Sequence, residues 1–498
     1  MRWLLTILAI ASLQLTGLSQ TNRWVPRSMS MDDCIETALR HNLDVQIRRY
    51  DPEIAGFTLA ALYGLYDPSF NLNYTHSDNN QPAGIDAQGR VFAGNENKGD
   101  SFSSGFSGSA PIGLTYNLGI ALNDQTTLNG ITGISTEIYG GDAGFLQLRQ
   151  PLLRDFWIDS ARLQIIIDKR EVKRSELDLK FTVMNTVFSV EQAYYNLIFA
   201  QENIKVQQKA VELAERQLAE NKKRVEVGAM APLDEKQAAS QVATSQADLL
   251  NALGTEETQQ RTLKGLLSDN YKEWENVAIQ PTEKLVALPR RFDLQESWRI
   301  GLNQRPDLIQ QRITVEEQGY RIRYQRNQLF PRLDAVGSAG YNSASPTFGG
   351  YLDQLGGRDN PFYSVGAQLS VPLSNKAARE AYKSSKATRA QVGLTLKQKE
   401  QNAMIAIEND IASANTKFQQ VHATHEATVY AEAALEAEQK KLENGKSTSF
   451  IVLQLTKDLT TARSAEISAL ANYNVALAQL SLDEGSTLDR RHVKLEWR

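Results

Sequence analysis

The sequence has little of the chemistry that most enzymes and metal proteins need. It contains one cysteine, Cys34, and five histidines in 498 residues. A lone cysteine cannot form an intrachain disulfide or a CxxC metal site. The chain has no GxSxG, HExxH or P-loop motif, and five histidines leave little material for a metal centre. We therefore expect no cofactor, no metal and no catalytic residue, so the protein is not predicted to be an enzyme.

The chain also lacks an excess of basic residues and a high overall hydropathy. Lysine and arginine total 54 against 58 aspartates and glutamates, which gives a net charge of −4. Nucleic-acid binders usually show a basic excess, so no nucleic acid is expected as a partner. The mean hydropathy of −0.40 excludes a bundle of transmembrane helices.

The first twenty residues resemble an export signal. Arg2 precedes a short apolar run over Trp3–Leu13, and small residues follow around Ser19. This order predicts a secretory signal peptide over residues 1–19, and the run is too short to span a bilayer as a helix. The alternative is a membrane anchor that stays attached. Cys34 lies too far along the chain to be a lipoprotein acyl site.

Proline is absent from long stretches, which permits long helices. None occurs between residues 151 and 232 or after Pro372, and apolar residues there recur at spacings of three and four, as at Ile407, Ile411 and Ala414. This pattern predicts coiled-coil-like packing, with the two longest helices each spanning roughly 100 Å. The predicted helices are Met31–Leu62, Ile158–Arg224, Leu233–Leu267, Leu294–Gln328, Ala377–Leu442 and Phe450–Leu480.

Segments of period two lie between these helices. Tyr116, Leu118 and Ile120, for example, alternate with Asn117 and Gly119. Such segments of about ten residues are typical of a membrane β-barrel, and the alternative is one face of a soluble β-sandwich. The export signal and the Ser/Asn/Gly-rich second face favour the barrel. The predicted strands are 68–78, 101–110, 113–123, 143–150, 331–341 and 363–371, with long loops at Gln81–Asp100, Gln125–Asp142 and Asn342–Asn360.

The order of helix, strands, long helix and shorter helix occurs twice. The segment Ala38–Asp44 aligns with Gly301–Asp307, and Val227–Ala229 aligns with Asn444–Lys446. We therefore predict two structural repeats, over residues 20–290 and 291–498.

In this order of features the chain resembles the TolC-like outer membrane efflux protein family. The similarity rests on the paired Ala-Leu-x-x-Asn-x-Asp-like starts, Leu329–Pro331 before a strand, Gln150–Leu152 before a long helix, and the Gly228 and Gly445 turns. The resemblance implies a mixed α/β membrane protein, in which strands of a partial transmembrane β-barrel join very long antiparallel coiled-coil-like helices that form an α-barrel. It also implies that a homotrimer completes the barrel.

The resemblance further implies a passive duct for efflux or secretion. Its expected partners are outer membrane lipid, a periplasmic adaptor (membrane fusion) protein and an inner-membrane transporter. It places the chain in the outer membrane of a Gram-negative-type bacterium, with a large periplasmic portion. One departure is the strand count, since the family typically contributes four strands per protomer and six are predicted here. The alternative function is a structural coiled-coil scaffold of the cell envelope.

The two turns between long helices are the main candidate site. Glycine supplies the left-handed conformation that a helix C-terminus often needs, so simple turn chemistry explains Gly228 and Gly445. By resemblance, these tips also dock the adaptor. The residues concerned are Val227, Gly228, Ala229, Asn444, Gly445 and Lys446.

By the same resemblance, acidic residues six and nine positions after the second glycine narrow the closed tunnel. Ile451 and Gln454 stand there, so the acidic ring is missing. Asp234 lies six positions after Gly228 and is a further constriction candidate, although an acid at a helix N-terminus is also favoured by the helix dipole. Leu442 and Ser447 replace the tyrosine and arginine that gate the tunnel in well-known members. His422 and His425 have a spacing that can hold a metal, but a solvated helix face explains them better.

Overall fold

The computed structural model describes residues 25–85, 87–228 and 230–493. The predicted signal peptide and Ala229 lie outside these residues. The chain divides into two compact units, each built from several segments. The sheet unit contains Arg49–Leu179 and Pro306–Asn402, and the hairpin unit contains the residues up to Arg48, Lys180–Arg305 and those from Ala403 onward.

The long helices are as predicted to within two residues at each end. α3 has 67 residues and α8 has 68. None of the described helices is both long enough and apolar enough to cross a membrane. The helices are α1 (Met31–His41), α2 (Leu43–Tyr63), α3 (Ser160–Glu226), α4 (Pro232–Leu267), α5 (Leu294–Gln304), α6 (Pro306–Asn327), α7 (Phe348–Gly357), α8 (Lys376–Glu443), α9 (Ser449–Asp483) and α10 (Thr487–Arg490).

The predicted helices Met31–Leu62 and Leu294–Gln328 were wrong in their continuity, because a single extended residue divides each of them into two helices. Asn42 separates α1 from α2, and its side-chain oxygen accepts hydrogen bonds from the N–H groups of Asp44 and Val45. Arg305 separates α5 from α6 because it precedes Pro306, and a residue before proline is disfavoured in the helical region.

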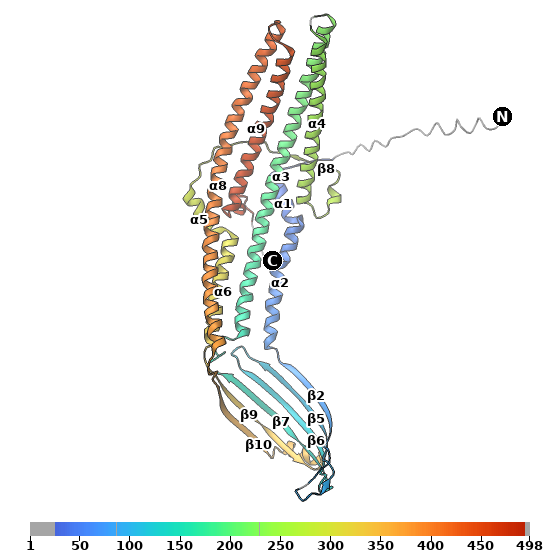
Figure 1. The fold of residues 1–498 in the computed structure, drawn as a ribbon, viewed down its shortest axis with the longest axis vertical. Helices are drawn as coiled ribbons and strands as arrows, with labels where there is room; N and C mark the ends of the chain where they lie inside the picture. Colours follow the sequence, from blue (N-terminus) through green and yellow to red (C-terminus); the bar gives the residue numbers. More distant parts are fainter. Residues whose placement is uncertain (1–24, 86, 229, 494–498) are drawn as a thin grey trace, which may run out of the picture. The chain divides into compact units, whose positions relative to one another are not determined.

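A six-stranded antiparallel sheet dominates the sheet unit (Figure 1), in the order β10-β9-β7-β6-β5-β2. This confirms the predicted six strands, and the chain turns tightly after Ala110, where Gly113 has a φ of +86°. The strands are β2 (Ser69–Asn80), β5 (Glu96–Ser109), β6 (Thr115–Leu128), β7 (Ser135–Pro151), β9 (Arg332–Ser345) and β10 (Pro361–Ser370), and two shorter strands, β3 (Gly84–Ile85) and β4 (Val91–Phe92), pair with each other.

The predicted loops were too long at the far ends of these strands. β5, β6 and β7 continue into segments expected as loops, and Asp100 pairs with Asp124 there. The alternation of apolar and polar residues stops before the backbone pairing does, so the pattern cannot mark the true strand ends. The third loop contains α7, which was not predicted because four of its ten residues are glycines.

In the hairpin unit, a buried core joins the first helix to the middle of α3. The parallel strands β1 (Val25–Met29) and β8 (Val277–Pro281) pair beside it. The Tyr194 hydroxyl donates to the carbonyl of Met29 at 3.1 Å, and Glu191, 1% exposed, forms an ion pair with Arg491 near the end of the described chain. Cys34 is fully buried, and burial raises the pKa of its thiol to about 12. Cys34 is therefore a packed core thiol.

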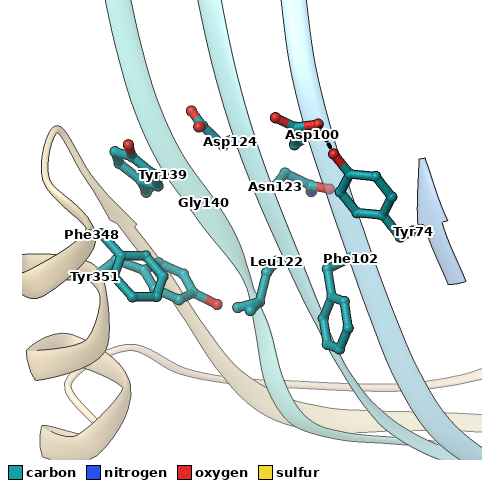
Figure 2. A pocket seen from close by; sticks show the side chains of 10 residues that line it. All are labelled: Tyr74, Asp100, Phe102, Leu122, Asn123, Asp124, Tyr139, Gly140, Phe348 and Tyr351. Carbon is teal, nitrogen blue, oxygen red and sulfur yellow. Dashed lines mark hydrogen bonds between the residues drawn. The ribbon is translucent and has the colours of Figure 1, made fainter. Parts of the chain in front are cut away.

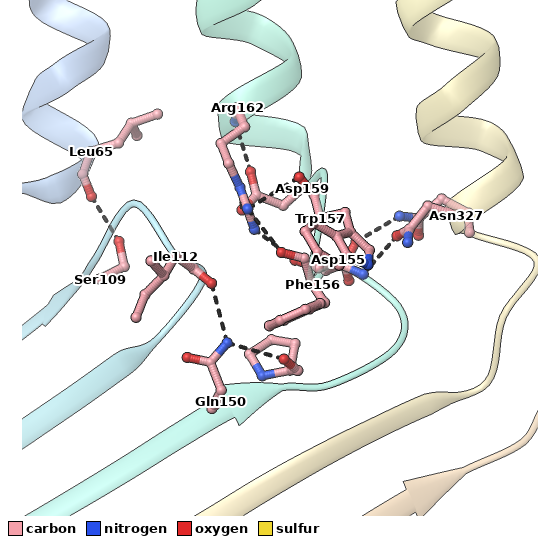
Figure 3. Close-up of polar contacts among 12 residues, drawn as sticks. Leu65, Ser109, Ile112, Gln150, Asp155, Phe156, Trp157, Asp159, Arg162 and Asn327 are labelled. Carbon is pink, nitrogen blue, oxygen red and sulfur yellow. Dashed lines mark hydrogen bonds and ion pairs between the residues drawn. The ribbon is translucent and has the colours of Figure 1, made fainter.

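The chain passes from β7 into α3 through a short braced loop (Figure 3). Asp155 has a φ of +68°, and its N–H donates to the side-chain oxygen of Asn327 at 2.7 Å. The Arg162 guanidinium donates to the carbonyls of Asp155 and Phe156, each at 2.8 Å. These bonds satisfy backbone carbonyls of the loop before α3, and Trp157 in the same loop has 80% of its surface exposed.

Candidate functional site

One face of the six-stranded sheet is apolar and exposed. Directly opposite residues of antiparallel strands share a face, so the register places Phe70, Phe106 and Leu118 side by side. The rings of Phe70 and Phe106 lie 5.1 Å apart. Soluble proteins rarely expose an apolar patch that crosses a whole sheet, so this apolar face requires lipid or a partner. Its exposed large residues are Phe70, Leu72, Tyr74, Phe106, Leu118, Ile120, Leu148, Tyr363, Val365 and Leu369.

The opposite, polar face carries hydroxyl and amide side chains. One row crosses all six strands and borders a hollow of about 760 Å³. Neighbouring side chains in it bond to each other, as Ser338 and Ser364 do at 2.7 Å between their hydroxyl oxygens. Such a face suits water and polar solutes. The row consists of Ser69, Ser107, Asn117, Gln147, Ser338 and Ser364.

A buried carboxylate holds an ion pair on the polar face. Asp334 of β9 is 1% exposed. The Arg149 guanidinium of β7 donates to its Oδ2 atom twice, from Nε at 2.8 Å and from Nη2 at 2.6 Å. A charge-assisted pair of this geometry is among the stronger hydrogen-bonded contacts in proteins, and it joins β7, the last strand of the first predicted repeat, to β9 of the second.

The sheet has two open edges. β2 and β10 each pair with a strand on one side only, and all their residues but one, Phe362, are exposed. An open edge presents unpaired backbone groups, which lipid cannot satisfy. Because six strands alternate in direction, β2 and β10 run antiparallel to each other, as two edges must if copies of the sheet are to join.

The first helix tip, between α3 and α4, is closed by glycine and by an acidic side chain. Gly228 has a φ of +75°, and its N–H donates to the carbonyl of Val225 at 3.0 Å. The Asp234 carboxylate accepts from the Ala231 N–H at 3.2 Å, which closes the start of α4. The tip leaves Val227 79% exposed and Leu233 65% exposed.

The second tip, between α8 and α9, repeats this geometry. Gly445 has a φ of +70° and donates to the carbonyl of Leu442 at 3.1 Å, while the Lys446 N–H donates to the carbonyl of Lys441 at 2.9 Å. This pair of bonds is a Schellman motif. Asn444 donates from its side chain to its own helix, and Phe450, which aligns with Leu233, is 59% exposed.

The two tips are joined by a buried polar contact that sequence reasoning missed. Asn221 of α3 is completely buried, and its side-chain amide donates to the Ser449 hydroxyl of α9 at 2.6 Å and to the Asp234 carbonyl at 3.2 Å. Gln217 donates to the Asn221 carbonyl oxygen at 2.9 Å. We call Gln217, Asn221 and Ser449 the tip clasp. Two amide side chains one helical turn apart, Gln217 and Asn221, were its only signal in the sequence.

An apolar cluster supports the tip clasp. Leu435 and Leu442 of α8 and Val452 and Leu459 of α9 are buried together, and Met230 of the first tip packs against them. Methionine fills irregular gaps well, so Met230 extends the core of one hairpin to the turn of the other.

The constriction candidates fall on exposed or half-exposed helix surfaces. Ile451 is 42% exposed. One oxygen of the Asp234 carboxylate already accepts the hydrogen bond from the Ala231 N–H at the start of α4. Gln454 donates to the carboxylate of Asp458 at 3.0 Å. Asp458 lies one turn beyond Gln454 on the same side of α9. This surface therefore carries an acid, but one turn away from the position of Gln454, where the resemblance implied it.

A carboxyl group in the hairpin unit is partly buried beside another. Burial, followed by a hydrogen bond with Asp483 and the charge of that residue, raises the pKa of Asp410 from 3.8 to about 7. Asp483 itself pairs with Arg305, whose Nη1 atom lies 2.8 Å from its Oδ1 atom. At neutral pH the Asp410 carboxyl therefore retains a proton for part of the time.

This raised pKa predicts a pH-dependent stability. The folded chain binds a proton that the unfolded chain releases between pH 3.8 and about 7, so the free energy of unfolding falls as the pH rises through that window. We expect Asp410→Asn to raise the melting temperature at pH 8 and to leave it nearly unchanged at pH 4. Asp458→Asn, on an exposed surface, is the matched control. Parallel stability curves for Asp410→Asn and the wild type would contradict the assignment.

The two helical histidines have ordinary contacts. His425 lies 2.7 Å from the carboxylate of Glu466, and the ring of His422 contacts Phe418 edge to face. Among the described residues, no group of three His, Cys, Asp or Glu side chains is placed to hold a metal ion.

The model of the outer membrane efflux protein family matches residues 111–268 and 300–483. The chain therefore belongs to the outer membrane efflux protein family. The chain is accordingly an outer membrane efflux duct. No curated protein sequence matches the chain.

Solved structures show the same fold at low sequence identity. The CmeC outer membrane channel of Campylobacter jejuni is 18% identical, with 92% of this chain and 86% of that chain covered and a TM-score of 0.66. VceC of Vibrio cholerae is 16% identical, with coverages of 91% and 96% and a TM-score of 0.65. The open state of the MtrE channel of Neisseria gonorrhoeae is 16% identical, with coverages of 93% and 91% and a TM-score of 0.61.

Proposed function

We propose that three copies of this chain join their sheets, edge β2 to edge β10, into one barrel of about eighteen strands. The observation that carries the proposal is a sheet with two open edges, an exposed apolar face and a hydroxyl- and amide-rich opposite face. In a closed ring the apolar face meets lipid, the polar face lines a wet lumen, and no edge remains open. The barrel lies in the outer membrane of a Gram-negative-type cell, and the helices lie in the periplasm. The two predicted repeats, 20–290 and 291–498, each contribute strands and a helix pair.

The helix tips are the proposed docking surface for a periplasmic adaptor, which links the duct to an inner-membrane transporter. Each tip exposes apolar side chains next to its glycine turn, Val227 and Leu233 on one tip and Phe450 on the other. Exposed apolar side chains at the end of a helix pair are the kind of contact that a helical partner buries. Asp234, Ile451 and Gln454, with Asp458, are the proposed lining of the narrow end.

The trimeric duct predicts ion conduction by the purified protein. A sample reconstituted in planar bilayers should have the mass of three chains and give discrete current steps. A monomeric sample that gives no current, with the tip clasp intact or broken, would overturn the proposal. The structural scaffold, its rival, requires neither a current nor a trimer.

The proposed edge pairing predicts a covalent trimer. Asn73→Cys in β2, combined with Ser364→Cys, Gly366→Cys or Gln368→Cys in β10, should give a disulfide-linked trimer for at least one of the three registers. Cys34 is buried and should not interfere. Asn73→Cys with Asn117→Cys on the central strand β6 is the matched control and should give no linkage between chains. Failure of all three edge pairs would contradict β2–β10 closure.

A further inference from the structure

We propose that α7 and the sheet beneath it form a binding site for an acyl lipid of the outer leaflet, with a preference for chains that carry a hydroxyl group near the carbonyl. This inference rests on the proposed barrel, because it requires the apolar face to meet lipid. The site lies where the apolar face ends, next to the loops that join β2 to β5, β6 to β7 and β9 to β10.

The site straddles the boundary between apolar and charged rows of the sheet. The register places Tyr74, Phe102 and Leu122 in one row and Asp100 and Asp124 in the next row toward the loops. Rows on one face are about 7 Å apart, two residues along a strand. This change from apolar to charged side chains is expected where acyl chains give way to headgroups.

α7 folds back onto this boundary on the apolar side of the sheet. Its residue Tyr351 is 1% exposed, and the Tyr351 carbonyl accepts from the Ser343 hydroxyl of β9 at 3.0 Å. Phe348 packs on Tyr139 of β7 with ring centroids 5.8 Å apart. Phe348 and Leu352 nevertheless remain 52% and 47% exposed, so the outer side of α7 continues the apolar face.

Between α7 and the strands is a cavity of about 130 Å³ (Figure 2), and it is lined mostly by aromatic and aliphatic side chains. Two buried polar atoms at this cavity have no hydrogen-bond partner among the described residues, the Tyr351 hydroxyl and the Oδ1 atom of Asp124. The Tyr74 hydroxyl, by contrast, is paired, because it donates to Asp100 at 2.6 Å. A buried unpaired donor or acceptor is costly, so we take these two atoms as the polar anchor points of the proposed site.

The two unpaired atoms define the chemistry of that ligand. The Tyr351 hydroxyl can donate to a carbonyl oxygen, and the Asp124 carboxylate can accept from a hydroxyl or amide hydrogen. Phe102 and Leu122 offer hydrocarbon beside them. A hydroxylated acyl chain carries all three features within a few atoms, and the cavity is too small for a whole lipid, so the rest of the molecule would lie along the exposed apolar face. A plain acyl chain would leave Asp124 without a donor.

The test uses the full-length trimer in phosphatidylcholine vesicles that contain one of two photoreactive phospholipids. The probes differ only in a hydroxyl group on the third carbon of the reactive chain. After illumination, labelled peptides are quantified by mass spectrometry. We expect the hydroxylated probe to label α7 and β6 at least fivefold more than the plain probe. Both probes should label β10 equally around Tyr363, which is 85% exposed.

Variants identify the groups responsible. Tyr351→Phe and Asp124→Asn should each reduce the fivefold preference to below twofold, while Tyr363→Phe should leave it unchanged. Trimer melting of each variant shows whether the sheet has remained folded. Equal labelling of α7 by both probes, or no labelling of α7 while β10 is labelled, would overturn the lipid site and leave the barrel standing. Absence of label from β10 as well would overturn the barrel itself.

Discussion

Arg149→Met is expected to destabilise the sheet by about 3 kcal/mol, because it leaves the Asp334 carboxylate buried without its only strong partner. Methionine keeps the length of the side chain and removes the charge. The loss can be measured as a lower urea concentration at the midpoint of trimer unfolding. Unfolding is monitored by the difference in gel mobility between folded and unfolded barrels.

The double variant Arg149→Met/Asp334→Asn should recover much of that loss, since the buried charge is then absent. Arg332→Met provides the matched control, because it removes an exposed arginine from the same face of β9. An Arg149→Met sheet as stable as the wild type would mean that water, and not the guanidinium, satisfies Asp334.

Asn221→Leu is expected to open the tips. Leucine keeps the branched skeleton of the asparagine side chain but removes its amide, so the Ser449 hydroxyl and the Asp234 carbonyl lose the Asn221 donor, at a cost of about 3 kcal/mol. If the closed state alone contains the tip clasp, that cost shifts the balance between closed and open states by about 100-fold. Single-channel recording should show a correspondingly larger open fraction.

Hydrogen exchange provides a second measure of the same change. The amides at the start of α9 and the end of α3 should exchange faster in Asn221→Leu. Asn444→Ala is the matched control, because the Asn444 side chain bonds only to its own helix at Lys440. Unchanged exchange and an unchanged open fraction in Asn221→Leu would show that the clasp does not hold the tips together.

The features that could be predicted from the sequence are those with a regular period. Helical spacing without proline located α3 and α8, and strict alternation located six strands, including the pair joined at Gly113. The periodic pattern could not predict the two points where a helix is interrupted. Asn42 interrupts the first helix through hydrogen bonds of its side chain, and Arg305 interrupts the second because a proline follows it.

The periodic pattern of apolar residues also could not predict contacts between segments that are far apart in the sequence. Asn221 and Ser449 are 228 residues apart in the sequence and meet only in the folded chain. The resemblance to efflux proteins implies acids at the positions of Ile451 and Gln454, and the sequence has none there. The resemblance did not show that Asp458 provides an acid one turn away, since that follows from the helix face and not from the motif.

The tip clasp consists entirely of neutral groups. Neither an amide nor a hydroxyl gains or loses a proton near neutrality, and contacts between uncharged groups are hardly screened by dissolved ions. Acidification or a change in ionic strength should thus leave the hydrogen bonds of the tip clasp almost unaffected. A partner that binds the tips therefore has to supply the free energy that separates the helices. Opening of the duct would then depend on that partner and not on the pH or salt concentration of the surroundings.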